Sequence, residues 1–474
     1  MSNQFDAIII GSGPNGLAAA IHLQQKGLST EIYEQAQEAG GATRSAEITL
    51  PGFIHDLGSA IHPLCMSSPF FKQLPLNEFG LEWVFPEIPY AHPFADGSAI
   101  AGYQDIEQTA RQLGKDGNAY YNLMNKLVED WPLLEGTVLN PFQIPSNPIK
   151  LASFGLKALM PAKAFSKLYF KDEKTRAYFY GSAAHSTLPL TNLASTSFGL
   201  VLGVIGHKYG WPFPRGGAKS IPESLIAYYK SIGGKIHLNR NISHMEDLPK
   251  AKAYLFDLTP KQILKIGGTK FEENYRNRMG NYRYGLGIFK MDFALDGPIP
   301  FTNELCRKAG TIHLGYSTKE MESSVNNAFN NLISPRPYVI LAQNSVFDSS
   351  RAPKGKHTAW AYCHVPNGSE TDMSTYIENQ IEKAAPGFRD LILTKTTHTT
   401  SQMEAFDPNL VGGDVNGGIQ DIRQLFTRPI AKWSPYNTSN KSIYICSAST
   451  PPGGGVHGMG GFNAAEKVLT DHFR

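Results

Sequence analysis

Three glycines near the amino terminus have the spacing of a dinucleotide-binding turn. Gly11, Gly13 and Gly16 form the pattern G-x-G-x-x-G, and Glu34 follows at the distance where such folds carry an acidic residue. The first glycine allows a tight turn, the second lets the backbone approach a pyrophosphate, and the third allows a helix to pack closely on a strand. A carboxylate at the later position accepts hydrogen bonds from ribose hydroxyls. These residues therefore predict a dinucleotide site.

The flanking sequence predicts the elements that position this site. Residues 5–10 (FDAIII) are an apolar run typical of a buried parallel strand, and residues 17–26 are good helix formers that end at Gly27. Residues 29–33 (STEIY) predict a second strand that leads into Glu34. A helix that begins at the glycine turn directs its positive N-terminus at the phosphates. We therefore expect the nucleotide site to include Pro14, Asn15 and Gln35 as well.

Two further glycine-containing segments have no clear purpose in a plain NAD dehydrogenase. Gly40 and Gly41 precede Arg44, and a turn with Asp56 and Gly58 comes next. Near the carboxyl end, residues 451–461 (PPGGGVHGMGG) connect a predicted strand, 442–447, to a predicted helix, 462–469. A glycine-rich connection of this kind lets the backbone approach a ligand closely, although an ordinary strand-to-helix connection is the alternative.

Together these motifs resemble the phytoene desaturase, carotenoid isomerase and retinol saturase group of flavoproteins, and most closely its pyridine nucleotide-disulfide oxidoreductase domain-containing protein 2 branch. Four more segments match that branch, so that the resemblance spans nearly the whole chain: 215–222 (RGGAKSIP), 256–260 (FDLTP), 352–357 (APKGKH) and 410–414 (LVGGD). The resemblance implies FAD as the cofactor, with the carboxyl-terminal helix beside the flavin ring. It also implies cofactor contacts at Gly41, Ala42, Thr43, Arg44, Gly58, Ser59, Ala60, Ile242, Ser449, Gly458, Met459 and Gly461.

Nucleotide-binding segments at both ends of the chain indicate a discontinuous domain. Between them, residues 216–229 predict a helix and residues 233–242 and 251–258 predict strands that extend the same sheet. We expect an α/β fold with a Rossmann-type FAD-binding domain, a parallel sheet flanked by helices, and an interleaved α+β substrate domain with the ligand in the shared cleft. The FAD-binding domain is assigned residues 1–75, 215–265 and 438–474, and the substrate domain residues 76–214 and 266–437.

The composition excludes several other classes of protein. A formal charge of +3 over 474 residues is too small for a nucleic-acid-binding surface. The four cysteines form no CxxC pair and no Cys/His metal spacing, so we expect neither dithiol chemistry nor a metal site. The sequence contains no GxSxG or GxxxxGK[ST] motif and one complete nucleotide fingerprint. The absence of a targeting segment and of a membrane-spanning run predicts a cytoplasmic protein that could still attach to a membrane surface.

Residues 136–171 are locally basic and apolar. Five lysines alternate there with leucine, phenylalanine and methionine, and there is no Asp or Glu. Such a segment can lie on an anionic membrane, where each lysine contributes about 1 kcal/mol, and can let a lipid pass inward. The alternative is a solvated helical face with its apolar side in the core. Residues 195–205 (STSFGLVLGVI) predict an apolar wall, which core packing would explain equally well.

Few side chains are candidates for chemistry, since a flavin itself accepts the hydride at N5. His457 is the candidate catalytic residue because it lies in the glycine-rich loop and can shuttle a proton; the alternative is a histidine that tunes or shields the flavin. His55, Asp56 and His62 resemble a metal cluster, but Asp56 is better suited to order the turn. Tyr282, Arg283, Tyr284 and His364 lie in the predicted substrate domain without an assigned role.

The sequence therefore predicts an FAD-dependent oxidoreductase that acts on an apolar isoprenoid or lipid-like substrate, with hydride transfer to flavin N5. Two alternatives remain: a redox-neutral polyene isomerase or saturase, and a lipid-binding flavoprotein whose FAD is structural. Oxidation of an amine is a further rival within the same superfamily. The partners expected are an apolar small molecule or lipid and a membrane surface, with no nucleic acid and no metal.

Overall fold

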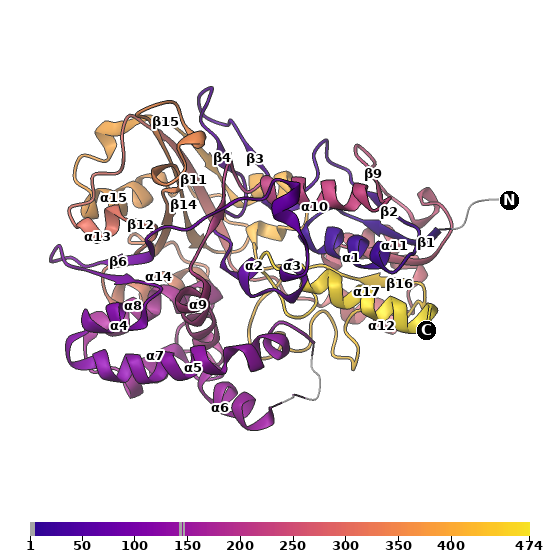
Figure 1. The fold of residues 1–474 in the computed structure, drawn as a ribbon, viewed down its shortest axis with the longest axis horizontal. Helices are drawn as coiled ribbons and strands as arrows, with labels where there is room; N and C mark the ends of the chain where they lie inside the picture. Colours follow the sequence, from indigo (N-terminus) through magenta and orange to yellow (C-terminus); the bar gives the residue numbers. More distant parts are fainter. Residues whose placement is uncertain (1–4, 142–144, 146) are drawn as a thin grey trace.

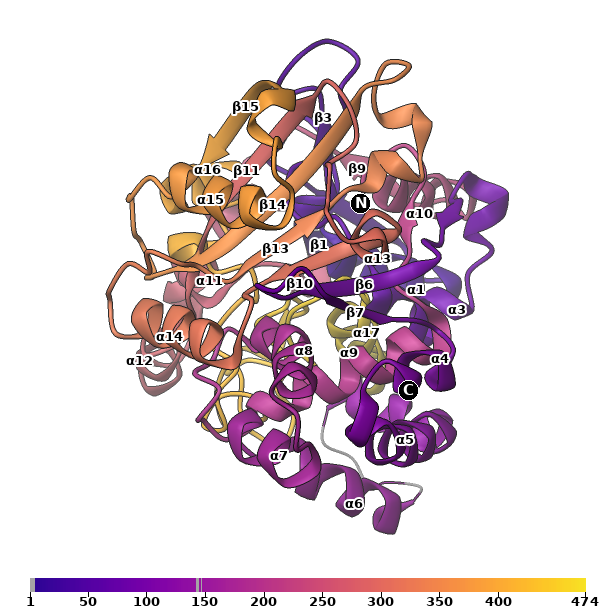
Figure 2. The same ribbon diagram turned by 90° about the vertical axis from the view of Figure 1, so that its left-hand side faces the viewer.

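The computed structural model describes residues 5–141, 145 and 147–474. Two large β-sheets organise the chain, and Figure 1 shows the parallel sheet around β1 beside the mixed sheet that contains β11 and β14. Helices α5 to α9 form a layer below the mixed sheet (Figure 2). The predicted fold class, a Rossmann-type parallel sheet with a second sheet domain, is confirmed.

The parallel sheet is built from short apolar runs that lie far apart in the sequence. In spatial order its strands are β16 (Ile443–Ile445), β10 (Ala251–Phe256), β1 (Phe5–Ile10), β2 (Thr30–Tyr33) and β9 (Lys235–His237). The strand predicted over 233–242 is shorter than expected because the chain leaves the sheet after His237, and residues 240–244 line a cavity instead. All five strands lie within the ranges assigned to the FAD-binding domain, whose boundaries stay a prediction.

Helices cover both faces of the parallel sheet. On one face pack α1 (Pro14–Gln25), α10 (Ser220–Ser231) and α17 (Met459–His472). On the other face pack α11 (Pro260–Gly267) and α12 (Glu273–Gly280). The α1–α17 crossing is very close, since a Cβ atom at Gly461 would lie 1.7 Å from the carbonyl oxygen of Asn15. Glycine at this position therefore lets the N-terminus of α17 lie beside the glycine turn.

The second sheet has seven strands, antiparallel except for the β12–β6 pair. In spatial order they are β15 (Ile392–His398), β11 (Gly287–Leu295), β14 (His357–Val365), β13 (Val339–Ala342), β12 (Ala309–Leu314), β6 (Ile88–Pro93) and β7 (Ala99–Gly102). One face packs on α13 (Glu304–Arg307) and α15 (Ser374–Ala384). The opposite face, with Tyr90, Ile340 and Tyr362, packs against the helical layer.

The helical layer closes the space below this sheet. Its members are α4 (Ile106–Arg111), α5 (Gly117–Val138), α6 (Pro148–Ala158), α7 (Ala162–Tyr169), α8 (Glu173–Ala183), α9 (Ser195–Tyr209) and α14 (Thr318–Phe329). The predicted apolar wall at 195–205 forms most of α9, whose glycines allow close packing: a Cβ atom at Gly199 would lie 2.8 Å from the Phe179 ring. Within the described ranges, no helix has the length and apolar character needed to cross a bilayer.

Short elements connect the sheets to the helices. They are β3 (Ser45–Ala46), β4 (His55–Asp56), α2 (Pro63–Ser67), α3 (Pro69–Lys72), β5 (Trp83–Val84), β8 (Phe213–Pro214) and α16 (Thr400–Phe406). Strand β4 contacts β14, and α2 contacts α9, so that residues 55–67 join the parallel sheet to the substrate side of the molecule.

Candidate active site

One large cavity is lined by residues from both sheets and from the helical layer. Its volume is about 1510 Å³, whereas an ordinary small-molecule pocket has roughly 300–1,000 Å³. The glycine turn and Glu34 line one end, and apolar side chains of α6, α9 and β14 line the other. The cavity therefore has room for a dinucleotide and for a second, apolar molecule.

The glycine turn and Glu34 form the polar end, as predicted. Gly11, Gly13, Pro14, Asn15 and Gln35 also line the cavity. The Glu34 carboxylate accepts hydrogen bonds from the Ser12 amide (2.9 Å), the Ser12 hydroxyl (2.7 Å) and the Ala36 amide (2.9 Å). These bonds fix the carboxylate after β2, and its remaining lone pairs are free to accept from a ribose. Gly16 lies behind the turn.

Asp257, at the end of β10, is a site residue that the motif search did not assign. Its Oδ2 accepts a hydrogen bond from the Gly16 amide at 2.8 Å, and burial raises the pKa of Asp257 to about 7. A Cβ atom at Gly13 would lie 2.6 Å from the same oxygen. The glycine turn is thus held against Asp257. In the sequence, the match of residues 256–260 (FDLTP) to the related branch was the one feature that could have indicated Asp257 as a site residue.

The second glycine motif packs directly on the first. Gly41 has φ +54°, in the left-handed region, and a Cβ atom there would lie 3.2 Å from the Cα of Gly13. Arg44 lines the cavity, but its side chain donates to the carbonyl oxygens of Gly41 (3.0 Å) and Phe406 (2.7 Å) and stacks on the Phe406 ring. Arg44 therefore braces α16 against this loop. Ala42 and Thr43 line the same wall.

Gly58, Ser59 and Ala60 form the next part of the wall. Glycine is required at position 58 for this turn to pack against Ala42, since a Cβ atom there would lie 2.2 Å from the Ala42 carbonyl oxygen. Asp56 orders this turn: it accepts from the Ser45 hydroxyl (2.8 Å) and the Ala218 amide (2.7 Å) and pairs with the buried Arg351 (2.6 Å). Within the described residues no group of three or more His, Cys, Asp or Glu is arranged to hold a metal ion.

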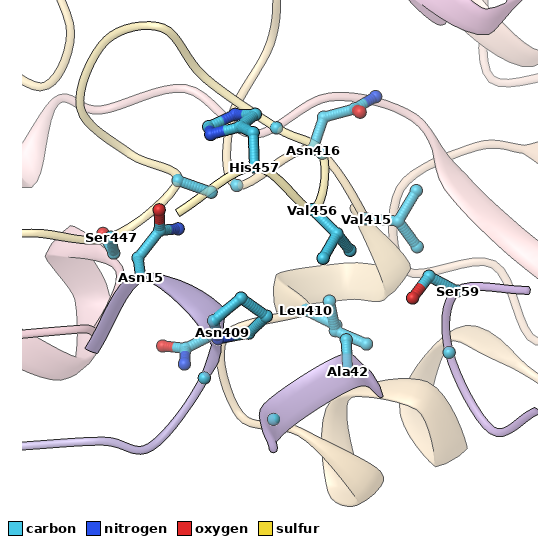
Figure 3. Close-up of a pocket in the computed structure, with 18 of the residues that line it drawn as sticks. Asn15, Ala42, Ser59, Asn409, Leu410, Val415, Asn416, Ser447, Val456 and His457 are labelled. Atoms are coloured by element: carbon cyan, nitrogen blue, oxygen red, sulfur yellow. The ribbon is translucent and has the colours of Figure 1, made fainter. Parts of the chain in front are cut away.

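The carboxyl-terminal glycine loop closes the cavity from the side opposite Ala42 and Leu410 (Figure 3). Val456 and His457 of this loop line the cavity. Both ring nitrogens of His457 contact backbone: Nδ1 accepts from the Met459 amide (3.0 Å), and Nε2 lies 3.2 Å from the Gly453 carbonyl oxygen. Burial lowers the pKa of His457 to about 4, so the ring is neutral. This geometry favours a structural role in the loop; catalysis by His457 stays a prediction.

The remaining predicted cofactor contacts lie at different depths. Ile242 lines the cavity next to the glycine turn. Ser449 is buried behind the wall, where its hydroxyl donates to the Gly417 carbonyl oxygen at 2.8 Å. Gly458, Met459 and Gly461 form the start of α17; Gly458 has φ +68° and packs on Phe70. These five residues support the wall or contribute to it, and their contact with a cofactor stays a prediction.

The polar end has the features of a cradle for FAD. Side chains are excluded at Gly11, Gly13, Gly16 and Gly41 by neighbouring backbone or by Asp257. The buried Asn15 Oδ1, beside the N-termini of α1 and α17, has no hydrogen-bond partner among the described residues. Backbone amides at helix N-termini and an unpaired acceptor suit a phosphate-containing ligand with ribose and amide groups. The residues present therefore fit the dinucleotide.

The other end of the cavity is apolar. Its walls contain Leu151, Phe154 and Ala158 from α6, Phe198, Val201 and Leu202 from α9, and Ile340, Trp360 and Tyr362 from the mixed sheet. Three of the carboxylates that line the cavity lie at the polar end: Asp257 contacts Gly16, Glu34 contacts Ser12, and Asp407 lies 3.6 Å from a Cβ atom built at Gly41. A fourth, Glu404, is paired with Lys261. The apolar end therefore suits an uncharged molecule.

The basic apolar segment has two different faces. Its residues Val138, Leu139, Leu151, Phe154 and Ala158 line the cavity, whereas Ile149 and Leu156 of α6 are 81% and 76% exposed. Lys150 pairs with Asp130 and Lys163 with Glu322 (both 2.7 Å). Helix α6 thus forms part of the cavity wall and also presents apolar side chains to solvent, and contact of this segment with a membrane stays a prediction. Residues 142–144 and 146 lie outside the described residues.

A buried ion pair on β11 also escaped the sequence analysis. Lys290 and Asp292 are fully buried and hydrogen-bonded, and Lys290 lies 6.0 Å from the ring centre of Trp360. Burial raises the pKa of Asp292 to about 6, and the Nδ1 atoms of His55 and His398 lie 3.7 and 3.8 Å from its oxygens. Such a pair is hard to recognise in the sequence, because a charged residue at alternate positions of a strand is normally expected to face solvent.

The tyrosine, arginine, histidine and cysteine residues that the sequence left without a role lie in different parts of the molecule. The Tyr282 hydroxyl donates to the Gly417 carbonyl oxygen at 2.6 Å, and Arg283 forms a two-bond pair with Asp421. Tyr284 accepts from the Lys261 amide at 3.1 Å. His364 is buried on β14. Cys65, Cys306, Cys363 and Cys446 are all buried and free.

Comparisons with known proteins agree with this geometry. Residues 9–74 match the family described as NAD(P)-binding Rossmann-like domain. The pyridine nucleotide-disulfide oxidoreductase domain-containing protein 2 of Mus musculus is 24% identical, covering 99% of this chain and 94% of that protein. A 4,4'-diapophytoene desaturase (4,4'-diapolycopene-forming) of a Methylomonas species is 24% identical, covering 96% of this chain and 93% of that protein.

Solved structures share the fold over the same length. An oxidoreductase from Methanosarcina mazei superposes with a TM-score of 0.66 at 17% identity, covering 98% of this chain and all of the other. An engineered putrescine oxidase superposes with a TM-score of 0.63 at 14% identity, covering 99% of this chain and 98% of the other. The predicted relationship, the oxidoreductase class and the FAD cofactor are confirmed. The chain is therefore an FAD-dependent oxidoreductase related to the phytoene desaturases and to pyridine nucleotide-disulfide oxidoreductase domain-containing protein 2.

Proposed function

We propose that the protein oxidises an apolar isoprenoid or lipid-like molecule in the cavity between its two sheets. The observation that carries this proposal is the continuity of the cavity, which joins the dinucleotide cradle to a wall of aliphatic and aromatic side chains. An apolar ligand gains roughly 25 cal/mol for each Å² that it removes from water. Binding in this cavity thus requires no charged partner at the apolar end.

The protein contributes position and shielding to the reaction. When bound, FAD would supply a hydride acceptor. The glycine turn, Glu34 and Asp257 would hold the dinucleotide, and Val456 and Ser59 also line the cavity (Figure 3). The side chains of α6 and α9 would exclude water and orient the substrate.

The rival functions differ in measurable ways. A redox-neutral isomerase or saturase would require reduced flavin without net turnover, and a carrier would bind lipid without reducing the flavin. Oxidation of an amine is less well supported, because Glu34 and Asp257, which could attract an ammonium group, lie at the glycine turn, and Glu404 is already paired with Lys261. The fold similarity to putrescine oxidase concerns the architecture alone.

Filling the apolar end tests the proposal directly. Gly155 lies on α6 in the cavity wall, and a Cβ atom there would meet no atom within 4 Å. We expect Gly155→Phe to lose most of the lipid that mass spectrometry detects in the purified protein and to keep its FAD. Gly280→Phe, on α12 and equally unobstructed, is the matched control and should keep both. Retention of bound lipid in Gly155→Phe would contradict the proposal.

We further propose that the exposed side of α6 and α7 contacts an anionic membrane, from which the substrate enters. Ile149, Leu156 and Leu168 are exposed large apolar residues on these helices, and Lys157 and Lys167 lie among them. Apolar side chains that enter the lipid boundary, flanked by lysines at the headgroups, are typical of peripheral membrane helices. Phe426 is 61% exposed and also lines the cavity, which supports an opening of the cavity to the surface at this loop.

Vesicle sedimentation tests this membrane contact. The Ile149→Ser/Leu156→Ser variant should bind at least tenfold less to vesicles that contain phosphatidylserine. Leu332→Ser/Leu393→Ser removes two exposed leucines elsewhere on the surface and should bind normally. Equal binding by both variants would refute the membrane proposal without affecting the proposed oxidation.

A further inference from the structure

We propose that His185 is a hydrogen-bonding point for a neutral oxygen group, and hence that the substrate is an apolar molecule with a hydroxyl or carbonyl function rather than a plain hydrocarbon. This inference rests on the proposed function, since it specifies which apolar molecule the cavity accepts. Nothing in the glycine motifs or in the resemblance assigns a role to His185.

The geometry around His185 directs one ring nitrogen to the cavity. His185 follows α8 and lines the cavity, and its Nε2 atom lies 3.0 Å from Nε2 of His313 on β12. No hydrogen-bond partner for its Nδ1 atom is found among the described residues, and His185 is half-buried. Two residues later, the Thr187 hydroxyl accepts from Asn416 at 3.3 Å, and Asn416 borders the cavity beside Val456 (Figure 3). His185 thus lies where the glycine loop meets the apolar end.

The surrounding aromatic residues hold the histidine pair in place. The Trp211 ring contacts both His185 (5.9 Å) and His313 (5.8 Å) edge-on and stacks on Tyr90 at 4.4 Å. Side-chain rotation of either histidine is therefore restricted by packing. A hydrogen-bonding group that is fixed in an apolar wall gives strong discrimination between ligands, because a ligand without a matching group leaves it unpaired.

Two further unpaired polar atoms lie on the same sheet face. Thr311 precedes His313 by two residues on β12 and therefore shares its face, and Trp360 lies on β14, separated from Thr311 by Ala342 of β13. Both residues line the cavity, and their buried Oγ1 and Nε1 atoms have no partner among the described residues. Buried polar atoms are rarely left unpaired in folded proteins. These atoms indicate a ligand that brings its own polar group to this part of the cavity.

His185, paired with His313, can bind an uncharged group that either donates or accepts a hydrogen bond. Burial lowers the pKa of His185 to about 3, so that its ring is uncharged. If His313 donates to His185, the Nδ1–H of His185 can donate to a carbonyl oxygen; if His185 donates, its Nδ1 can accept from a hydroxyl. A carboxylate would lose its hydration beside an uncharged ring and is disfavoured.

Binding of three compounds with one carbon skeleton tests this inference. The probes are farnesol, the corresponding hydrocarbon without the hydroxyl, and the corresponding carboxylic acid, added to the FAD-loaded protein at pH 7.5. Binding is followed by tryptophan fluorescence, since Trp211 and Trp360 both line the cavity, and requires no turnover. We expect the alcohol to bind about tenfold more tightly than the hydrocarbon and than the acid, as one buried hydrogen bond predicts.

Two variants and one control assign this preference to His185. His185→Phe should reduce the alcohol-to-hydrocarbon ratio to about one, and His185→Asn, which keeps a hydrogen-bonding group, should retain part of it. Ile340→Val, in the same wall, should change the affinity for both compounds equally. Three results would overturn this inference and leave the proposed function intact. They are equal binding of alcohol and hydrocarbon by the unmodified protein, a preference for the acid, and an unchanged ratio in His185→Phe. If no probe binds at all, the proposed function fails with it.

Discussion

At the residue scale, the surroundings of a side chain decide its role more than its type does. His457 and His185 both border the cavity, but the backbone occupies both ring nitrogens of His457, whereas Nδ1 of His185 has no partner among the described residues. Glu34 and Asp257 are likewise both acidic and close to the glycine turn. Glu34 keeps lone pairs toward the cavity, and Asp257 holds the Gly16 amide.

The first prediction concerns the binding of FAD by the polar end. Glu34→Ala should lower the affinity for FAD at least tenfold, because it removes a charged acceptor and frees the three donors that the carboxylate binds. Gly13→Val should abolish binding, since its side chain would meet Asp257. Flavin absorbance per protein after gel filtration measures both effects. Glu47→Ala, exposed on the following loop, is the control, and full occupancy in both site variants would refute the assignment.

The sequence was informative about residues where a motif constrains the backbone. The cradle residues Gly13, Glu34 and Gly41 were predicted, because their spacing reflects turns that few other residues allow. His185, Lys290 and Asp257 were not assigned, because their environment depends on contacts with residues far away in the sequence, such as His313 and Gly16. No local pattern records such contacts.

At the element scale, the crossing of α1 and α17 joins the two ends of the chain at the cofactor site. Strand β1 and helices α1 and α17 were predicted close to their observed positions, since apolar runs and glycine stops define them. The length of β9 was overestimated, because sequence alternation does not show where a chain leaves a sheet to line a cavity. The position of α6, with one cavity face and one exposed face, depends on tertiary packing.

The second prediction tests the close approach of these two helices. Gly461→Val should destabilise the protein by about 1–3 kcal/mol or more, because its Cβ atom would overlap the Asn15 carbonyl oxygen and push α17 away. FAD affinity should fall in parallel, since the N-termini of both helices border the cradle. Ala464→Gly, one turn later on α17, changes helix propensity without a clash and serves as the control. Unaltered FAD binding in Gly461→Val would show that the crossing does not support the site. Thermal unfolding and flavin titration measure these effects.

At the scale of the whole molecule, burial of many histidines makes stability depend on pH. Burial lowers the pKa of eight histidines to about 3 or 4: His55, His62, His92, His185, His207, His364, His398 and His457. Above pH 6.5 these rings are neutral in both the folded and the unfolded chain. Below pH 6.5 the unfolded chain binds protons that the folded chain excludes, so that stability falls toward pH 4. Four buried carboxyls with raised pKa values act in the opposite direction but are fewer: Asp257, Asp292, Asp407 and Asp414.

The third prediction follows from this balance. The unfolding temperature should decrease steeply between pH 6.5 and 5, with about 1.4 kcal/mol lost per pH unit for each excluded proton. His92→Leu removes one buried histidine whose two ring nitrogens have no partner among the described residues, and it should weaken this pH dependence. Differential scanning calorimetry across this range measures both. A stability that is constant from pH 7.5 to 5 would contradict the account.

The central claim is that the FAD in this cavity oxidises an apolar substrate. Anaerobic mixing of the oxidised protein with lipid extracted from the same protein tests this claim most directly, with the flavin absorption band and the mass of the lipid recorded together. We predict that the flavin band bleaches and that the recovered lipid has lost two hydrogens. Bound lipid with an unchanged flavin band and an unchanged mass would contradict the claim and would favour a lipid carrier.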